Sequence, residues 1–208
     1  MNAAATAIDT RTQILDIAEQ LARQRGFGGF SYRDISQPLG IKNAAIHYHF
    51  PTKADLGVAL LTRYGEILSS LTSEFMKHGG CALDQLEGFI AFYGNKICSN
   101  QGTCLIATLA SEFATVPAAM QEAGKTLSMD IRNWMTKVLD VGRQQGEFNF
   151  DGDPGDKALL ILTSMQGASQ LARMAGPATM DAAVRQIRAD LGIGSELVRK
   201  WDRTEAIA

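Results

Sequence analysis

Apolar residues recur at spacings of three and four along most of this chain, and this pattern constrains the fold more than any other feature. Between residues 56 and 75 the apolar positions advance by four, four, four, three and four. Such spacing places side chains on one face of an α-helix, whereas a half-buried strand alternates at every second residue. Only residues 147–150 alternate, and only briefly. The sequence therefore predicts an all-α fold.

Residues that begin and end helices divide the apolar pattern into segments. Ser31 with Asp34, and Thr52 with Asp55, match the capping box, in which a hydroxyl and a carboxylate satisfy free amides of the first helical turn. Pro38 limits the length of the second segment, because proline has no amide hydrogen to donate. We expect helices between residues 10 and 26, 31 and 40, 43 and 50, 53 and 78, 83 and 97, 105 and 113, 117 and 139, 156 and 175, and 178 and 191.

Composition places the chain among ordinary globular proteins. It has 208 residues, of which 46% are hydrophobic, and 20 Lys and Arg against 22 Asp and Glu, which gives a net charge of −2. This balance excludes a protein coated in basic residues for non-specific nucleic-acid binding, although it allows a local basic face. No apolar run approaches the ~18 residues of a membrane span, and the first residues do not resemble a secretory signal. We expect a cytoplasmic protein with no membrane partner.

The residues with reactive or metal-binding side chains form no recognisable catalytic or metal site. Cys81, Cys98 and Cys104 are an odd number, so reduced thiols are expected instead of a disulfide framework. These cysteines and the three histidines are not spaced as the paired ligands of a structural zinc site. From about residue 70 onward the sequence also shows no phosphate-binding loop, no Ser/His/Asp order and no paired carboxylates in a plausible site. We therefore expect no metal, no cofactor and no enzymatic activity.

Two short helical segments joined by a turn at Gly40 lie between residues 31 and 50. Such a pair, preceded by another helix, is the pattern of a helix-turn-helix DNA reader. Ile41, Ile46 and Phe50 would anchor the second segment. On its other side are a cation, an amide and two rings suited to phosphates and base edges, and two alanines that permit close approach: Lys42, Asn43, His47, Tyr48, Ala44 and Ala45.

The run G-I-K-N-A-A-I-H-Y-H-F-P-T-K-A-D-L at residues 40–56 resembles the recognition helix and following linker of TetR-type transcriptional regulators. The resemblance extends upstream to R-G-F at 25–27 and F-S-Y-R-D-I at 30–35. It implies a DNA-binding domain over 9–69, with its helix-turn-helix motif at about 31–50, and a helical effector-binding and dimerisation domain over 70–208. It also implies a homodimer that binds operator DNA as a repressor and is released by a small-molecule effector.

The resemblance also implies roles for individual residues in DNA binding. Tyr32 and Arg33 would meet a phosphate or a groove edge, and Thr52 with Lys53 would clamp phosphates. Lys53→Ala should then reduce the salt slope, which is the slope of log affinity against log salt concentration, by about one, with little change in sequence preference. The residues implied to contact DNA are Tyr32, Arg33, Lys42, Asn43, Ala44, Ala45, His47, Tyr48, Thr52 and Lys53.

Parts of this assignment have alternatives. The ring of Tyr48 could equally lie in the core. For His49 we expect a packed or capping role in preference to base reading. We expect ordinary solvated charges at Arg11, Arg23 and Arg25. Many relatives have Gly, Ser or Thr early in this helix and Tyr-Tyr or Tyr-His where this chain has His47 and Tyr48, so the operator sequence cannot be taken from a relative.

In the C-terminal part we expect a core or an effector cavity lined by methionine and aromatic residues, which include Met120, Met129 and Met135. Cys104 lies at a predicted helix start, where the helix dipole favours a reactive thiolate. It sits in G-T-C-L, which resembles a Gly-Cys-Leu element of one branch of the family with Thr103 inserted, and it could sense electrophiles or oxidants. A buried, inert cysteine is the alternative. The candidate effector-sensing residues are Cys104, Phe92, Trp134 and Met165.

The last two predicted helices, at 156–175 and 178–191, are suited to a dimerising four-helix bundle, and Gly167, Ala168 and Ser169 would allow close approach across it. Two other function classes remain. One is an all-α enzyme with Cys104 as nucleophile, and the other is an adaptor whose N-terminal helices bind protein. Both predict weak, salt-insensitive binding to DNA, whereas a repressor that contacts several phosphates should lose affinity steeply with salt.

Overall fold

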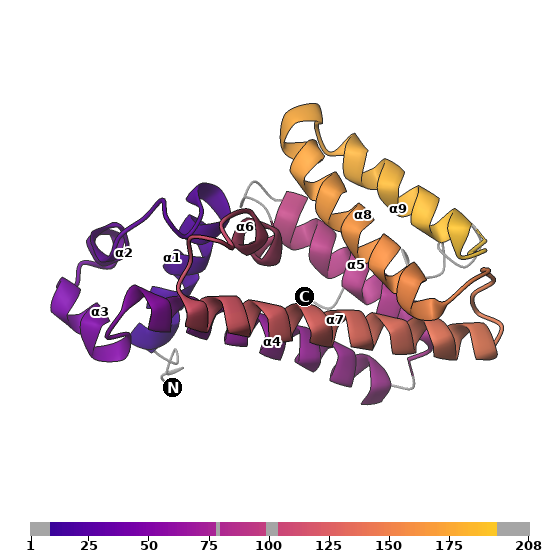
Figure 1. Ribbon diagram of the computed structural model, residues 1–208, viewed down its shortest axis with the longest axis horizontal. Coiled ribbons are helices and arrows are strands. Elements are labelled where there is room, and N and C mark those ends of the chain that lie inside the picture. Colours follow the sequence, from indigo (N-terminus) through magenta and orange to yellow (C-terminus); the bar gives the residue numbers. More distant parts are fainter. Residues whose placement is uncertain (1–8, 78–79, 99–103, 195–208) are drawn as a thin grey trace, which may run out of the picture. The chain divides into compact units, whose positions relative to one another are not determined.

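The computed structural model describes residues 9–77, 80–98 and 104–194, with the backbone alone for 71–77 and 95–98. Within these ranges the chain is helical and contains no strand, which confirms the predicted all-α fold (Figure 1). Glu147 to Phe150, which alternate in the sequence, form no strand, and Phe148 and Phe150 are buried. The helices are α1 (Thr10–Arg25), α2 (Tyr32–Leu39), α3 (Asn43–His49), α4 (Lys53–Lys77), α5 (Ala82–Cys98), α6 (Leu105–Ser111), α7 (Ala118–Gln144), α8 (Pro154–Ala175) and α9 (Ala178–Asp190).

The chain divides into two compact units, and both are built from segments that are separate in sequence. The N-terminal unit comprises residues up to Tyr64 together with Leu105–Lys125, and the C-terminal unit comprises Gly65–Cys104 and the residues from Thr126 onward. The predicted boundary near residue 69 therefore differs from this division. Helix α6 and the first turns of α7 pack with the N-terminal helices.

The capping boxes predicted from the sequence are present. Both the amide and the hydroxyl of Ser31 donate to Asp34 Oδ2, at 2.8 and 2.6 Å, at the start of α2. Thr52 makes the same two bonds to Asp55 Oδ2, at 2.9 and 2.7 Å, at the start of α4. At the end of α2, Gly40 adopts a left-handed conformation with φ of 66°. This turn sets the direction in which α3 leaves α2.

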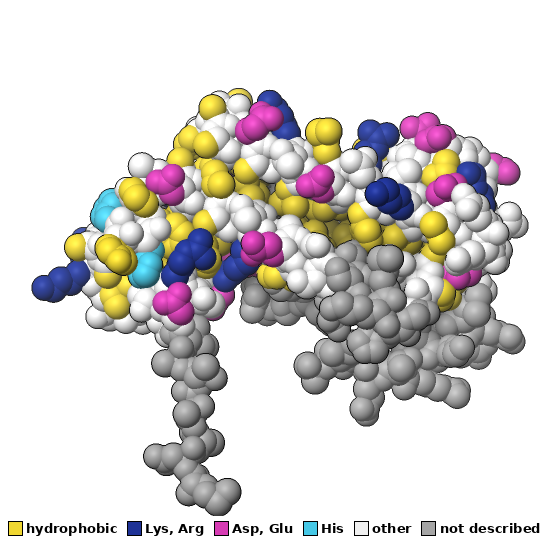
Figure 2. Space-filling view, turned by 90° about the horizontal axis from the view of Figure 1, so that it is seen from below, with side chains coloured by type: hydrophobic (Ala, Val, Ile, Leu, Met, Phe, Trp, Pro, Cys, Tyr) yellow, Lys and Arg dark blue, Asp and Glu magenta, His cyan; other side chains and the backbone are white. Residues whose placement is uncertain are grey.

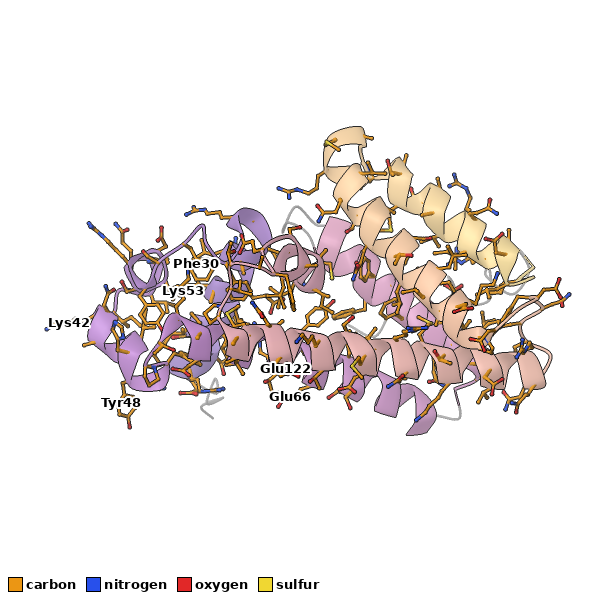
Figure 3. All side chains as sticks on the ribbon, viewed as in Figure 1. Phe30, Lys42, Tyr48, Lys53, Glu66 and Glu122 are labelled. Atoms are coloured by element: carbon orange, nitrogen blue, oxygen red, sulfur yellow. The ribbon has the colours of Figure 1, made fainter. Side chains whose placement is uncertain are left out.

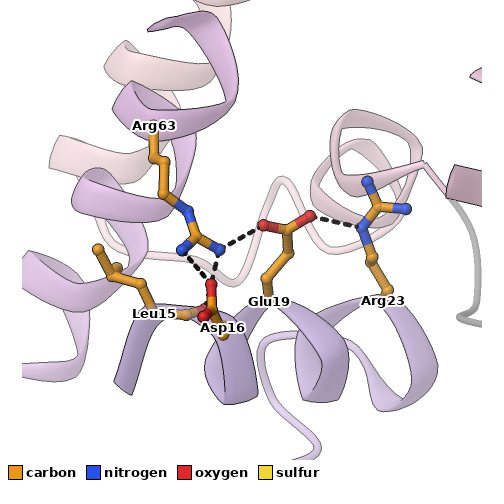
Figure 4. Close-up of polar contacts among 5 residues, drawn as sticks. All are labelled: Leu15, Asp16, Glu19, Arg23 and Arg63. Carbon is orange, nitrogen blue, oxygen red and sulfur yellow. Dashed lines mark hydrogen bonds and ion pairs between the residues drawn. The ribbon is translucent and has the colours of Figure 1, made fainter. Parts of the chain in front are cut away.

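An ion-pair network fastens α4 to α1 within the N-terminal unit (Figure 4). The Arg63 guanidinium donates to Asp16 Oδ1 at 2.6 Å and to Glu19 Oε2 at 2.5 Å. The other oxygen of Glu19 lies 3.1 Å from Nε of Arg23. Arg23 is buried, so the expectation of a solvated charge is wrong for this residue.

The segment after α6 binds the turn between α1 and α2. Glu112 Oε2 accepts a hydrogen bond from the Gly28 amide at 3.1 Å, across 84 residues of sequence. Gly26 has a φ of 80°, and a side chain there would overlap the Glu112 carboxylate. Glycine is therefore required at this position both by the backbone and by the approach of Glu112.

In the C-terminal unit α8 and α9 lie side by side, and α5 packs against α8 (Figure 1). The buried Glu87 of α5 forms a two-pronged ion pair with Arg188 of α9, at 2.8 and 2.5 Å. Met135 and Met165 are buried in this unit as expected, and Met120 is buried in the N-terminal unit. The expectation for Met129 is wrong, because its side chain is 63% exposed. At about 100° per residue, it points about 200° away from the buried Leu127 on α7.

Candidate nucleic-acid interface

Helix α3 has one buried side and one exposed side. Ile46 and the following Phe50 are buried among the helices of the N-terminal unit. The exposed side consists of positions one and four residues apart, which share a helix face: Asn43, Ala44, His47 and Tyr48, with Ala45 half-buried at its edge. Tyr48 is 84% exposed, so the alternative of a core ring is wrong.

Basic side chains accompany this exposed face. Lys42 is the N-cap residue of α3 and Arg33 lies in the first turn of α2, and both side chains are exposed. Neither forms an ion pair with any residue that the structure describes. In Figure 2 the cyan histidines lie at the surface of this unit, with dark blue Lys or Arg side chains on both sides. Lys42 and Tyr48 point outward in Figure 3.

Tyr32 lies inside the helix-turn-helix, although its sequence position suggested a phosphate or groove contact. Its hydroxyl donates to the carbonyl of Phe50 at 2.7 Å, and its ring meets the edge of the His47 ring at 4.7 Å between centroids. Burial, and to a smaller extent the negative charge of Asp55, raises the pKa of Tyr32 from 10.0 to about 12. The hydroxyl therefore holds the end of α3 against α2, and a DNA contact for Tyr32 stays a prediction.

His49 packs between its neighbours, with ring centroids 5.2 Å from Tyr48 and 6.4 Å from Phe50. This is the packed role expected from the sequence. Thr52 is exposed, and its hydroxyl both donates to Asp55 and accepts from the Asp55 amide at 3.1 Å. It caps α4, and its phosphate contact stays a prediction.

Lys53 directs its ammonium group into the protein. Nζ donates to the carbonyls of Phe27 and Phe30, in the turn between α1 and α2, and lies 4.3 Å from the centroid of the Phe30 ring (Figure 3). Burial lowers the pKa of Lys53, and the charges of Glu112 and Asp34 oppose this shift. The two carbonyls stabilise the ammonium charge, which the dipole at the N-terminus of α4 disfavours. The expected phosphate clamp at Lys53 therefore stays untested.

The structure adds Arg11 to the residues beside α3. The Arg11 guanidinium lies over the Phe50 ring, 5.2 Å from its centroid, and the side chain is exposed. No local signal in the sequence could have found it, because the contact joins the first turn of α1 to the end of α3. Arg25 pairs with Asp34 at 3.4 Å in an exposed position, as expected of a surface charge.

The four candidate effector-sensing residues differ in exposure. Cys104 and Met165 are each only 1% exposed, and Phe92 and Trp134 are half-buried. Trp134 packs against Phe89 at 5.5 Å, and its buried indole Nε1–H finds no acceptor in the described part of the chain. Reactive cysteines are usually partly exposed, so the burial of Cys104 disfavours both the sensor and the enzyme nucleophile. Burial also raises the pKa of Cys81.

Among the described residues, no group of three His, Cys, Asp or Glu is placed to hold a metal ion. No described helix is long and apolar enough to cross a membrane.

Two sequence models together match most of the chain. Residues 14–60 match the model described as bacterial regulatory proteins of the tetR family, and residues 82–187 match the tetracyclin repressor-like C-terminal domain. The chain belongs to the TetR family. The first match contains the whole helix-turn-helix with α3 and its exposed face, and the chain is a DNA-binding transcriptional regulator, as the sequence predicted.

Similar proteins from several bacteria support this assignment. A TetR-family transcriptional regulator from Agrobacterium tumefaciens has a solved structure with a TM-score of 0.81 and 32% identity, over 87% of this chain and 96% of that one. The transcriptional repressor NemR of Escherichia coli is 25% identical over 173 residues, which cover 81% of this chain and 86% of NemR. The repressor KstR2 of Rhodococcus jostii is 24% identical over 177 residues, or 85% and 86% of the two chains.

Proposed function

We propose that this TetR-family regulator is a homodimeric repressor that binds a palindromic operator through α3 and is released by a small molecule bound in its C-terminal unit. The observation that carries the proposal is the exposed face of α3. It combines groups suited to base edges with two nearby cations, Arg33 and Lys42, that form no ion pair within the described part of the chain. The repressors NemR and KstR2, to which the chain is similar, support repression over activation.

The residues around α3 divide into two kinds of DNA contact. Arg33, Lys42 and Thr52 suit phosphates, and Tyr32 and Lys53 support the site from inside. Arg11, exposed beside Phe50, joins the phosphate contacts. The exposed face of α3 contacts the base edges through polar groups and small methyls that lie on this face or at its edge: Asn43, Ala44, Ala45, His47 and Tyr48.

An exposed apolar stripe on α8 supports the dimer. Leu160, Leu171 and Met174 are exposed and share one helix face with Gly167, at steps of seven, four and three residues. A second copy of the same stripe would cover it in a two-fold arrangement. Gly167 leaves open space in which another helix can approach. Ala168 and Ser169 are buried within the unit, so the expectation that they line the dimer contact is wrong.

The indole N–H of Trp134, which is buried and has no acceptor among the residues that the structure describes, supports an effector that carries a hydrogen-bond acceptor on an apolar body. A buried donor without a partner costs about 1–3 kcal/mol, and an acceptor on a ligand would recover this. Binding of 2-acetylnaphthalene and of 2-ethylnaphthalene, which is similar in size but has no acceptor, can be compared by fluorescence. Wild type should prefer the ketone, and Trp134→Phe should remove the preference. Equal binding of both by wild type contradicts this role.

The electrophile sensor is a separate possibility for release. If alkylating agents release DNA from the wild type but not from Cys104→Ser, Cys104 is the sensor. If both proteins release DNA equally, the burial of Cys104 is sufficient to explain its presence.

The test of the proposed function is selection of DNA from a random pool by the full-length protein, followed by binding measurements across a salt series. A palindromic site and a steep salt dependence are expected. Lys42→Ala should reduce the salt slope by about 0.9, and the exposed Arg132→Ala in α7 is a control with the same charge change. Leu171→Asp should convert the dimer to a monomer in sedimentation. Absence of any consensus, with weak and salt-insensitive binding, would overturn the proposal.

A further inference from the structure

His47 is exposed on α3, yet two contacts fix the orientation of its ring. Nδ1 lies 3.1 Å from the carbonyl oxygen of Pro51, just beyond the end of the helix. The ring also meets Tyr32 edge to face, with an interplanar angle of 64°. Tyr32 is itself held by its hydrogen bond to Phe50. The imidazole is therefore placed before any DNA arrives.

The contact with Pro51 determines which ring nitrogen carries the hydrogen. A carbonyl oxygen can only accept, so Nδ1 must be the donor. Neutral imidazole has a single N–H, and the other nitrogen then holds a lone pair. The Nε2 atom of His47 is thus a hydrogen-bond acceptor on an exposed side chain of the recognition helix.

An acceptor can bind only a few groups on DNA. Phosphate oxygens, guanine O6 and N7, and thymine O4 are acceptors themselves, and they offer Nε2 no hydrogen. The major groove has two donors, the N6 amino group of adenine and the N4 amino group of cytosine. We propose that His47 reads one of these amino groups through Nε2 and so specifies one base pair in each half-site.

This inference rests on the proposed operator binding and adds a rule for base choice. His47 stands where many relatives have tyrosine, whose hydroxyl can donate to a phosphate. With Nδ1 committed to Pro51, neutral His47 has no donor left for a phosphate. The residue therefore contributes sequence preference and adds nothing to the salt dependence.

Base analogues in the selected operator test the proposal directly. Purine replaces adenine, and pyrimidin-2-one replaces cytosine, at one half-site position at a time, so that a single amino group is removed. Affinities are measured at pH 8.5 for wild type, His47→Ala and His47→Phe, which keeps a ring against Tyr32. Comparing each variant with wild type on each operator cancels the effect of the analogue on the duplex itself.

At one position per half-site, wild type should lose about 2- to 12-fold in affinity, the range of a single hydrogen bond of 0.5–1.5 kcal/mol. Both His47 variants should lack this loss, apart from any effect of the analogue on the duplex that all proteins share. Asn43→Ala, which changes a neighbouring reader, should keep the wild-type loss there. His47→Ala should also leave the salt slope unchanged.

Two results would overturn the inference. One is an equal change in affinity for wild type and both His47 variants when the amino group is removed at every position. The other is a loss of affinity that depends on His47 when a guanine or a thymine is changed. Either result, obtained with tight binding of wild type to a palindrome, refutes the role of His47 alone. Failure of wild type to select any operator would instead refute the proposed function.

Discussion

Lys42 and Lys53 are eleven residues apart beside the same DNA-binding face, and their replacement should have opposite effects. Lys42 is exposed at the start of α3, whereas the ammonium of Lys53 donates to the carbonyls of Phe27 and Phe30. We expect Lys53→Ala to lower the stability of the protein and to leave the salt slope of DNA binding nearly unchanged. Lys42→Ala should leave stability within about 0.5 kcal/mol and reduce the salt slope by about 0.9.

The magnitude for Lys53 follows from its contacts. Each hydrogen bond from a charged donor contributes about 1.5–3 kcal/mol, and the position over the Phe30 ring adds about 0.5–1 kcal/mol. Desolvation of the ammonium, which lowers its pKa, opposes these gains. Water can also reach the two carbonyls once the side chain is removed, because Gly28 and Gly29 between them are exposed. A net loss of about 1–3 kcal/mol remains, which corresponds to a fall in Tm of about 2–12 °C.

The assay combines thermal unfolding at one fixed protein concentration with DNA affinity at four or more salt concentrations. The concentration is fixed because the stability of an oligomer depends on it. The reasoning is refuted if Lys53→Ala has the same Tm as wild type and its salt slope of DNA binding falls by about 0.9. That result would give Lys53 the phosphate contact that the sequence suggested.

Three further changes test other parts of the structure. Because the pKa of Tyr32 is raised to about 12, neutral Tyr32 contributes stability that is complete below pH 10 and is lost as pH rises toward about 12. In urea unfolding between pH 9 and 12, the free energy of unfolding should fall more steeply with pH for wild type than for Tyr32→Phe. Parallel declines would contradict the raised pKa. Glu87→Gln should cost about 3–5 kcal/mol because it removes the buried carboxylate charge that pairs with Arg188. Glu87→Leu combined with Arg188→Met should regain most of this loss in denaturant unfolding, and a double variant as unstable as the single one would oppose the interpretation. Gly142→Ala should destabilise by about 1–3 kcal/mol because the new methyl would overlap the buried Phe148 ring. Gly94→Ala, where no described atom would contact the new methyl, should gain up to about 1 kcal/mol, and equal melting temperatures of the two variants would show that the ring moves aside.

Features that depend on a few neighbouring residues could be predicted from the sequence. The capping boxes at Ser31 and Thr52 are local hydrogen bonds, and the structure contains both. The exposed face of α3 also follows from a local rule, because burial of Ile46 and Phe50 leaves Asn43 and His47 on the other side. For the same reason the all-α fold could be predicted from spacing alone.

Features that depend on packing between distant segments could not be predicted. Lys53 is a plausible phosphate clamp until the carbonyls of the turn at residues 27–30 lie next to it. Arg11 carries no signal until α1 reaches the end of α3. The bond between Glu112 and Gly28, which places α6 with the N-terminal helices, joins residues too far apart in sequence for any periodic pattern to indicate.

The N-terminal unit is discontinuous, and this limits how such regulators can exchange their parts. A hybrid protein joined near residue 69 would take α1 to α3 and the first part of α4 from this chain, and it would lose the segment at Leu105–Lys125. The Gly28 amide would lose its carboxylate, and the surface of α4 at Gly57 would lose the Met120 side chain that lies against it. A transplanted DNA reader would therefore be incomplete unless residues 105–125 travel with it, so a working graft needs two insertions in the recipient.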